Sequence, residues 1–240
     1  MMPTKNNSLE WSAIVFALVY PTILTWVYFI ALAESDPGLQ KGAYGIGKVI
    51  QFAFPLVFVL LICKERLQFR GLDTSGLVMA VGFGLLVAGA MLGLYYFWLK
   101  PAGFFAGPVT LEVQKKLKGF GIASLAAYAV LAVFYTLVHS LLEEYYWRWF
   151  VFGRLRNLTP LAAAVAISSV GFAAHHVLVL AKYFGWDSPA TWLFSAGVAI
   201  GGVVWALVYQ RTKSLLGPWL SHLLVDAAIF AIGYDLMTPA

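Results

Sequence analysis

The sequence predicts an all-α protein, a polytopic bundle of about seven transmembrane helices. Of its 240 residues, 61% are hydrophobic and only 11% are charged, whereas soluble domains carry about 25% charged residues. So few charges cannot cover a surface that faces water. The apolar residues also fall into runs of about 20, the length of a helix that crosses roughly 30 Å of hydrocarbon. We therefore expect an integral membrane protein.

Seven runs have this length, at approximately 11–33, 45–63, 76–99, 120–150, 160–181, 190–210 and 214–235. The first ends in Ala31-Leu32-Ala33, which resembles a signal-peptidase site. Its apolar stretch is about twice as long as that of a signal peptide, so we expect it to remain as a transmembrane helix. Pro55 is expected to kink the second helix.

The connections and spacings predict some local features. The pairs Gly89/Gly93 and Gly197/Gly201 are spaced for close helix packing. Residues 109–118 form either a short helix on the membrane surface or a solvated loop. No tandem repeat or soluble domain is visible. We divide the chain into N-terminal transmembrane helices with their loops, 1–119, and a core, 120–235, which holds the polar residues of interest.

The charges limit the possible partners and suggest an orientation. The net charge of +5 is expected to face anionic lipid rather than nucleic acid. Nine lysines and arginines lie on the side of the N-terminus and seven on the other. This excess predicts that the N-terminus faces the cytoplasm. The expected membrane is the inner (plasma) membrane of the cell. The single cysteine, Cys63, excludes an intramolecular disulfide. The oligomeric state is left open.

Ionisable side chains are concentrated within three of the predicted spans, although each costs about 2.5–3.5 kcal/mol at the centre of a helix. All four histidines of the chain belong to this set, together with three acids and one arginine. The set comprises His139, Glu143, Glu144, Arg148, His175, His176, His222 and Asp226. For His139, a hydrogen-bonded position between helices is the preferred interpretation over catalysis.

Spacing predicts which of these groups can meet. Glu144 and Arg148 are four residues apart, as are His222 and Asp226, so each pair can interact along one helix. If a turn occupies 154–159, Glu143 lies roughly 16 Å before it, and His222 lies roughly 12 Å into the last span on the same side. Glu143, His176, His222 and Asp226 can then share one layer below that surface.

A carboxylate and imidazoles in a dry cavity are suited to peptide hydrolysis by water. Glu143 can take a proton from the water, and a histidine can share it or stabilise an oxyanion. The chain has neither a G-x-S-x-G nor an H-E-x-x-H motif. Three other interpretations stay open: a polar clasp between helices, a transporter or proton relay, and an inactive protease-like bundle that binds a membrane peptide.

Three motifs on successive hydrophobic segments carry a family resemblance: Glu143-Glu144-x-x-x-Arg148, Phe172-x-x-x-His176 and His222-x-x-x-Asp226. Together they resemble the motifs of the CAAX protease and bacteriocin-processing (CPBP, or ABI) family of intramembrane proteases, which includes the Rce1 enzymes. The resemblance covers about 120–235.

The resemblance implies a role for each motif residue. Glu143 would be the catalytic glutamate and His176 its partner in activating water. His222 and Asp226 would orient water and stabilise the oxyanion, although the family more often has asparagine at the position of Asp226. Glu144 and Arg148 would hold the site together, with Phe172 supporting His176.

The resemblance also implies a glutamate-type mechanism without a metal. The alternative is a zinc protease in which Glu143, His176 and His222 bind the metal. The expected partner is a membrane-anchored peptide or protein, cut near the cytoplasmic face. Nothing in the sequence indicates a prenyl pocket, so we do not expect specificity for CAAX tails as such.

Overall fold

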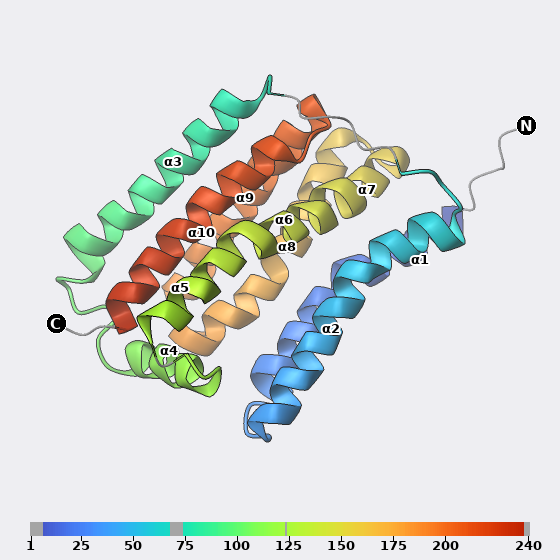
Figure 1. Cartoon of the computed structure of the whole chain (residues 1–240). Coiled ribbons are helices and arrows are strands. Elements are labelled where there is room, and N and C mark those ends of the chain that lie inside the picture. The colour runs from blue at the N-terminus through green and yellow to red at the C-terminus, as the bar shows by residue number, and fades with distance from the viewer. Residues whose placement is uncertain (1–6, 68–73, 123, 238–240) are drawn as a thin grey trace, which may run out of the picture. The chain divides into compact units, whose positions relative to one another are not determined.

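The structure is a computed structural model that describes residues 7–67, 74–122 and 124–237, and every regular element in these ranges is helical (Figure 1). Within these described ranges, seven helices are long and apolar enough to cross a membrane: Asn7–Ala31, Pro37–Ile62, Leu77–Leu99, Leu125–Leu158, Leu161–Phe184, Pro189–Thr212 and Leu216–Met237. The seven predicted spans are confirmed, and the chain is an integral membrane protein. The segment Pro108–Gly119 is a helix, α4, rather than a loop.

Two predicted boundaries were wrong because local capping decides them. The second span begins at Pro37, where the Asp36 carboxylate accepts hydrogen bonds from the backbone N–H groups of Gly38 and Leu39 (2.9 and 3.0 Å). The predicted turn at 154–159 is helical as far as Leu158, and the chain breaks only at Thr159, which precedes a proline. The fourth span is therefore Leu125–Leu158 rather than 120–150.

The fourth span, which we call the fourth helix, is not uniformly α-helical. It consists of α5 (Leu125–Val133), a π-helical stretch (Phe134–His139), α6 (Ser140–Glu144), a second π-helical stretch (Tyr145–Phe152) and α7 (Gly153–Leu158). The wider turns of a π-helix change which side chains share a face of the helix, and π-helical segments recur at functional sites. Glu143 and Glu144 thus lie at the end of a short α-helical segment that is flanked by two π-helical stretches.

The helices pack into two compact units. The first contains residues 1–71 and 145–207, and the second contains residues 72–144 and 208–240. The division at residue 119 was drawn from the location of the polar residues in the sequence and not from packing, and it stays a prediction.

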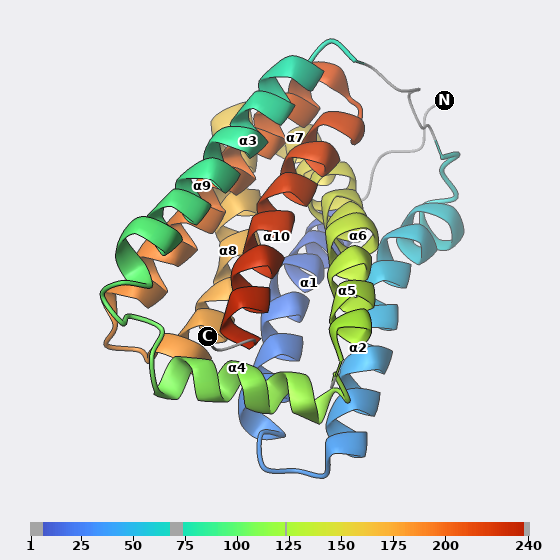
Figure 2. The same cartoon turned by 60° about the vertical axis from the view of Figure 1, so that its left-hand side comes forward.

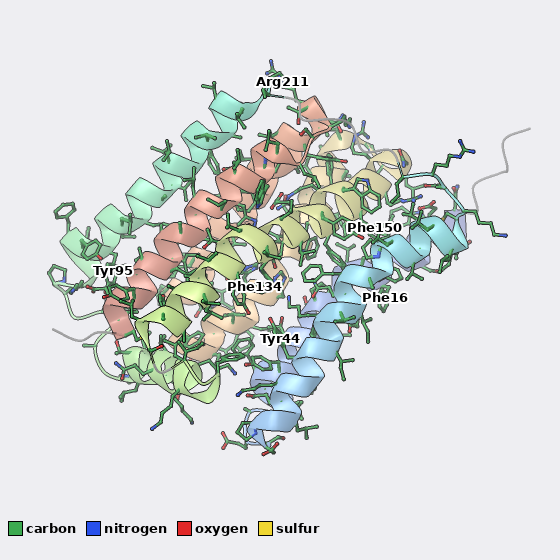
Figure 3. The ribbon with its side chains drawn as sticks, in the orientation of Figure 1. Phe16, Tyr44, Tyr95, Phe134, Phe150 and Arg211 are labelled. Atoms are coloured by element: carbon green, nitrogen blue, oxygen red, sulfur yellow. The ribbon has the colours of Figure 1, made fainter. Side chains whose placement is uncertain are left out.

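In the first unit, α1 (Asn7–Trp26) packs against α2 (Pro37–Val57) and α8 (Leu161–Phe184). The Tyr20 hydroxyl of α1 donates to the carbonyl of Gly47 in α2 (3.1 Å). Tyr146, in the second π-helical stretch of the fourth helix, donates to the carbonyl of Ala17 in α1 (2.8 Å). Phe150, labelled in Figure 3, packs edge-on against Phe58, with 5.7 Å between the ring centroids. The unit also contains the greater part of α9 (Pro189–Thr212).

In the second unit, α3 (Leu77–Leu94) runs along α10 (Leu216–Met237), as both views show (Figures 1 and 2). Their close approach depends on Gly84, where a β-carbon would lie 2.9 Å from the carbonyl oxygen of Ser221. A β-carbon at Gly89 or Gly93 would meet nothing within 4 Å. The predicted packing role of that pair was wrong, because α3 presents a different glycine to its neighbour.

Candidate active site

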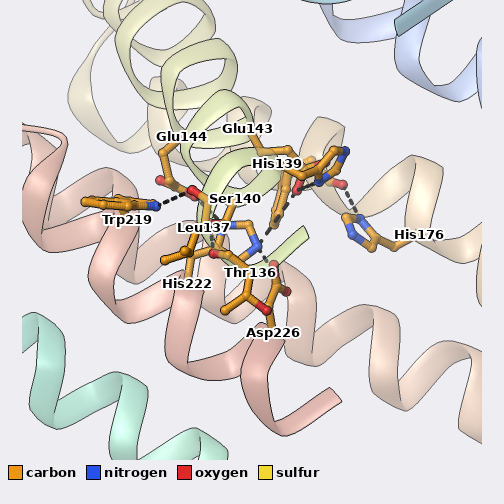
Figure 4. A network of polar contacts seen from close by, with 11 residues as sticks. Thr136, Leu137, His139, Ser140, Glu143, Glu144, His176, Trp219, His222 and Asp226 are labelled. Carbon is orange, nitrogen blue, oxygen red and sulfur yellow. Dashed lines mark hydrogen bonds and ion pairs between the residues drawn. The ribbon is translucent and has the colours of Figure 1, made fainter. Parts of the chain in front are cut away.

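His222 is held by an acid from a different helix. It lies in α10, and its Nδ1 is 2.9 Å from Oε1 of Glu144 on the fourth helix (Figure 4). Glu144 is fully buried and His222 is 5% exposed. An ionised carboxylate can only accept, so with Glu144 ionised Nδ1 carries the proton and donates it to Glu144. This bond fixes the ring, so Nε2 points away from Glu144.

The Nε2 side of His222 faces two further carboxylates. Oε2 of Glu143 lies 3.8 Å from Nε2, and Oδ1 of Asp226 lies 3.6 Å from it. The contact between His222 and Asp226, predicted from their spacing, is confirmed. A second imidazole also approaches Glu143, since Nδ1 of His139 is 3.9 Å from the same Oε2. Two imidazoles thus approach the same carboxylate oxygen of Glu143.

A hydrogen bond from α10 holds the first π-helical stretch of the fourth helix. In the π-helical stretch Phe134–His139, the carbonyl of Leu137 accepts a hydrogen bond from the indole Nε1 of Trp219 (3.0 Å; Figure 4). Ser140 donates its hydroxyl to the carbonyl of Thr136. Because Trp219 precedes His222 by three residues, one face of α10 supports the turn and presents the imidazole.

His176 and Phe172 lie on α8, in the first unit. Nδ1 of His176 is 2.9 Å from the carbonyl oxygen of Phe172, one turn earlier. A carbonyl only accepts, so this bond places the proton on Nδ1 and leaves Nε2 of the neutral ring as a base. The two rings also touch edge-on, with centroids 4.9 Å apart. The spacing of the second motif therefore sets the tautomer of His176.

Arg148 is fully buried in the first unit. Its guanidinium lies over the ring of Phe172 (4.9 Å to the centroid) and near that of Trp205 (5.5 Å). Cation–π contacts of this kind stabilise a desolvated arginine. The ring of His175 lies 4.1 Å from that of His176, centroid to centroid, and stacks in parallel on Trp147 with 6.0 Å between centroids. The predicted ion pair between Glu144 and Arg148 stays a prediction.

An apolar groove of about 550 Å³ lies in the second unit, between the first part of the fourth helix and α10. Small alanines and aromatic rings line most of it. Its lining residues are Leu125, Tyr128, Ala129, Ala132, Val133, Thr136, Leu137, Ala227, Phe230, Ala231 and Tyr234. Ala227 directly follows Asp226 and Thr136 precedes His139 by three residues, so one end of the groove adjoins the polar cluster.

A separate ionic cluster of the first unit joins α1 and α7 to the non-helical segment that follows Ile62. Arg154 of α7 donates to Oε1 of Glu10 in α1 (2.8 Å) and, with two nitrogens, to both oxygens of Glu65 (3.1 and 2.7 Å). Donor atoms of Glu10, Glu65 and Cys63 lie within 4.8 Å of one another, which is close enough for a metal. The guanidinium already supplies the cation that these carboxylates need, so we assign the cluster a structural role.

Sequence reasoning missed several supporting contacts of the site. Spacing along one helix predicted Glu144 beside Arg148, whereas the bond of Glu144 to His222 joins residues 78 apart in the chain. Trp219 could have been found, because it shares a helical face with His222. No sequence signal linked Trp205 to Arg148, since the contact depends on how α9 packs.

Comparison with known protein families gives a match for this chain. Residues 123–228 match the family model described as Type II CAAX prenyl endopeptidase Rce1-like. The matched range includes all three motifs, from Glu143 to Asp226. No curated protein and no solved structure matches the chain.

Proposed function

We propose that this chain, which carries in residues 123–228 a domain of the Rce1-like type II CAAX prenyl endopeptidase family, is a glutamate-type intramembrane endopeptidase. It hydrolyses a peptide bond of a membrane-associated protein or peptide with water as the nucleophile. The observation that carries the proposal is the buried contact of Glu143 with an imidazole whose other nitrogen is held by Glu144. A polar contact that only joined two helices would not need one carboxylate to hold the imidazole and a second carboxylate at its other nitrogen.

In this mechanism Glu143 is the general base. Its carboxylate takes a proton from water as the water oxygen attacks the carbonyl carbon of the substrate, which forms a tetrahedral intermediate. The same carboxyl group then gives the proton to the leaving nitrogen, and the C–N bond breaks. A carboxylate placed in this way contributes typically about 10²–10⁴-fold to the rate.

His176 is proposed as the second group on the water. Glu143 precedes Leu158 by 15 residues, and His176 follows Leu161 by 15 residues. Counted along the chain, both residues therefore lie equally far from the break between their two helices. The unprotonated Nε2 of His176 is then the atom that accepts a hydrogen bond from the water.

His222 and Asp226 are proposed to stabilise the oxyanion. Glu144 holds the ring of His222 through Nδ1, and a proton on Nε2 can be directed at the oxygen that becomes negative in the transition state. A preoriented donor in a site without bulk water stabilises that charge without reorganisation. Asp226, 3.6 Å from Nε2, either pairs with the imidazolium or donates as a neutral acid.

The substrate is proposed to be a membrane-anchored peptide whose apolar residues lie in the groove beside Asp226. The groove is apolar along its length and adjoins the cluster at one end, so a chain lying in it would present a peptide bond to Glu143. We retain the cytoplasmic N-terminus, the plasma (inner) membrane and cleavage near the cytoplasmic face as parts of the proposal.

A turnover assay with purified protein tests the reaction and its metal requirement together. The wild type, reconstituted in liposomes with peptides extracted from membranes, should generate new peptide termini that mass spectrometry can identify. A chelator should not lower this turnover, because Glu143 and the histidines need no metal in the proposed mechanism. The matched control is the same liposomes without the protein.

Two results would change the conclusion. The absence of any new terminus across the peptide mixture would contradict the endopeptidase. Turnover that a chelator abolishes and zinc restores, with one zinc per chain by elemental analysis, would favour the metalloprotease in which Glu143, His176 and His222 are ligands.

Substitutions of Asp226 distinguish charge from hydrogen bonding. Asp226→Asn should retain most of the activity and mainly alter its pH profile, since an amide still donates a hydrogen bond. Asp226→Leu should lose activity, because it leaves Nε2 of His222 without this partner. The measurement is the cleavage rate against pH at matched protein levels. Equal loss in both variants would mean that the charge itself is essential.

A further inference from the structure

The carboxylate of Glu143 is approached by imidazoles from two helices. His222 of α10 lies 3.8 Å from Oε2, and His139 of the fourth helix lies 3.9 Å from the same atom. We propose that His139 is a positioning residue for Glu143, which holds the carboxylate in the orientation that activates water. The inference rests on the proposed function, and none of the three motifs includes His139.

The surroundings of His139 keep its ring in place. The imidazole stacks at a tilt on Tyr135, with centroids 4.7 Å apart, and Tyr135 in turn contacts Phe230 of α10 at 5.8 Å. His139 ends the π-helical stretch whose Leu137 carbonyl is bonded to Trp219. His139 thus belongs to a π-helical stretch that α10 contacts both through the ring of Phe230 and through the hydrogen bond from Trp219.

Glu143 needs such a partner because its carboxylate is not fixed by its own geometry. The last torsion of a glutamate is broad, so the two oxygens exchange places easily. Two imidazoles that approach the same oxygen restrict this rotation. The 3.9 Å separation is longer than a hydrogen bond, but contacts in unliganded catalytic sites commonly tighten when substrate binds.

Low solvent exposure makes the contact effective. The side chain of His139 is 14% exposed and that of Glu143 is 5% exposed. Little water can screen the pair, so an N–H aimed at a carboxylate acts more strongly than it would at a surface. If His139 served only to pack the helices, another ring of similar size could replace it without changing the chemistry.

The contact can be tested without any protease activity. The chain has four histidines, so protein labelled with ¹⁵N in its imidazoles gives four sets of ring resonances, and His139→Asn identifies one of them. Glu143→Gln should then shift the Nδ1 resonance of His139. The control Glu112→Gln, on α4, should leave it in place. An unchanged resonance in Glu143→Gln would overturn the proposal.

A kinetic comparison tests the role itself. The probe is a fluorescence-quenched version of the peptide that the wild type cuts best in the liposome assay. His139→Phe keeps a ring without N–H donors and should lower kcat about 10-fold with little change in KM, because a slightly misplaced base binds substrate but reacts slowly. His139→Asn keeps a donor near the position of Nδ1 and should recover most of kcat.

The outcomes separate the two proposals. Full activity of His139→Phe, or equal loss in the Phe and Asn variants, would refute the positioning role. If the wild type cuts no peptide, the proposed function fails, and the resonance experiment still decides whether His139 responds to Glu143.

Discussion

Replacing Glu143 by glutamine should lower the rate of peptide cleavage by at least about 100-fold, the usual contribution of a general base. Glutamine has nearly the same shape and keeps an oxygen near His222, but it cannot take a proton from water. The measurement is kcat of the purified variant in liposomes on a peptide that the wild type cuts. His176→Ala should cause a comparable loss, because it removes the proposed second acceptor for the water.

The neighbouring glutamate provides the matched control. Glu144→Gln changes the charge by the same amount one residue later, and its amide oxygen can still accept from Nδ1 of His222. We expect it to reduce expression or stability more than turnover, since Glu144 positions the imidazole and is fully buried. Substantial turnover by Glu143→Gln, or a larger loss of kcat in Glu144→Gln, would contradict the assignment of the base.

Replacing Arg154 by methionine should destabilise the protein by about 3 kcal/mol, the scale on which removing one partner of a buried ion pair acts. Arg154 is 7% exposed and joins Glu10 to Glu65. Its loss leaves the Glu10 carboxylate buried without its cation. The side chain of Glu65 is 40% exposed, so its own pair with Arg154 adds little. A denaturant titration in mixed micelles measures the free energy of unfolding.

Two further variants make this prediction specific. Arg154→Lys keeps the charge but loses the two-pronged geometry, so its stability should lie between those of the wild type and Arg154→Met. The double variant Glu10→Gln/Arg154→Met should be more stable than Arg154→Met alone, because it removes the stranded charge. If the second substitution lowers stability further, the penalty does not come from a buried carboxylate.

The sequence alone was sufficient to predict the number of spans and the membrane class. A run of about 20 apolar residues has few alternatives in lipid, where backbone groups must bond within the segment. Helix ends were less predictable. The beginning at Pro37 depends on a cap by Asp36, and the end at Leu158 depends on the proline after Thr159. Asp36 and the proline can both be read from the sequence, but a hydrophobicity pattern alone does not predict the helix ends that they set.

Contacts within one helix were also predictable, because the helical repeat determines them. The spacing of His222 and Asp226 implied their contact. The bond from Nδ1 of His176 to the carbonyl of Phe172, four residues earlier, follows the same helical repeat. The departure of the fourth helix from α-geometry was not predictable in this way. Its π-helical stretches on both sides of Ser140–Glu144 change which side chains share a face there.

Only the tertiary structure decided which groups meet across helices. The sequence identified Glu143, Glu144 and His222 as unusual because ionisable groups in lipid are costly. It did not indicate that Glu144 would hold His222, or that His139 would face the same oxygen of Glu143 as His222 does. Such contacts depend on the rotation of α10 against the fourth helix, which close packing at Gly84 and the bond from Trp219 help to set. Periodicity assigns a residue to a face of its own helix, whereas packing between helices selects the partner of that face.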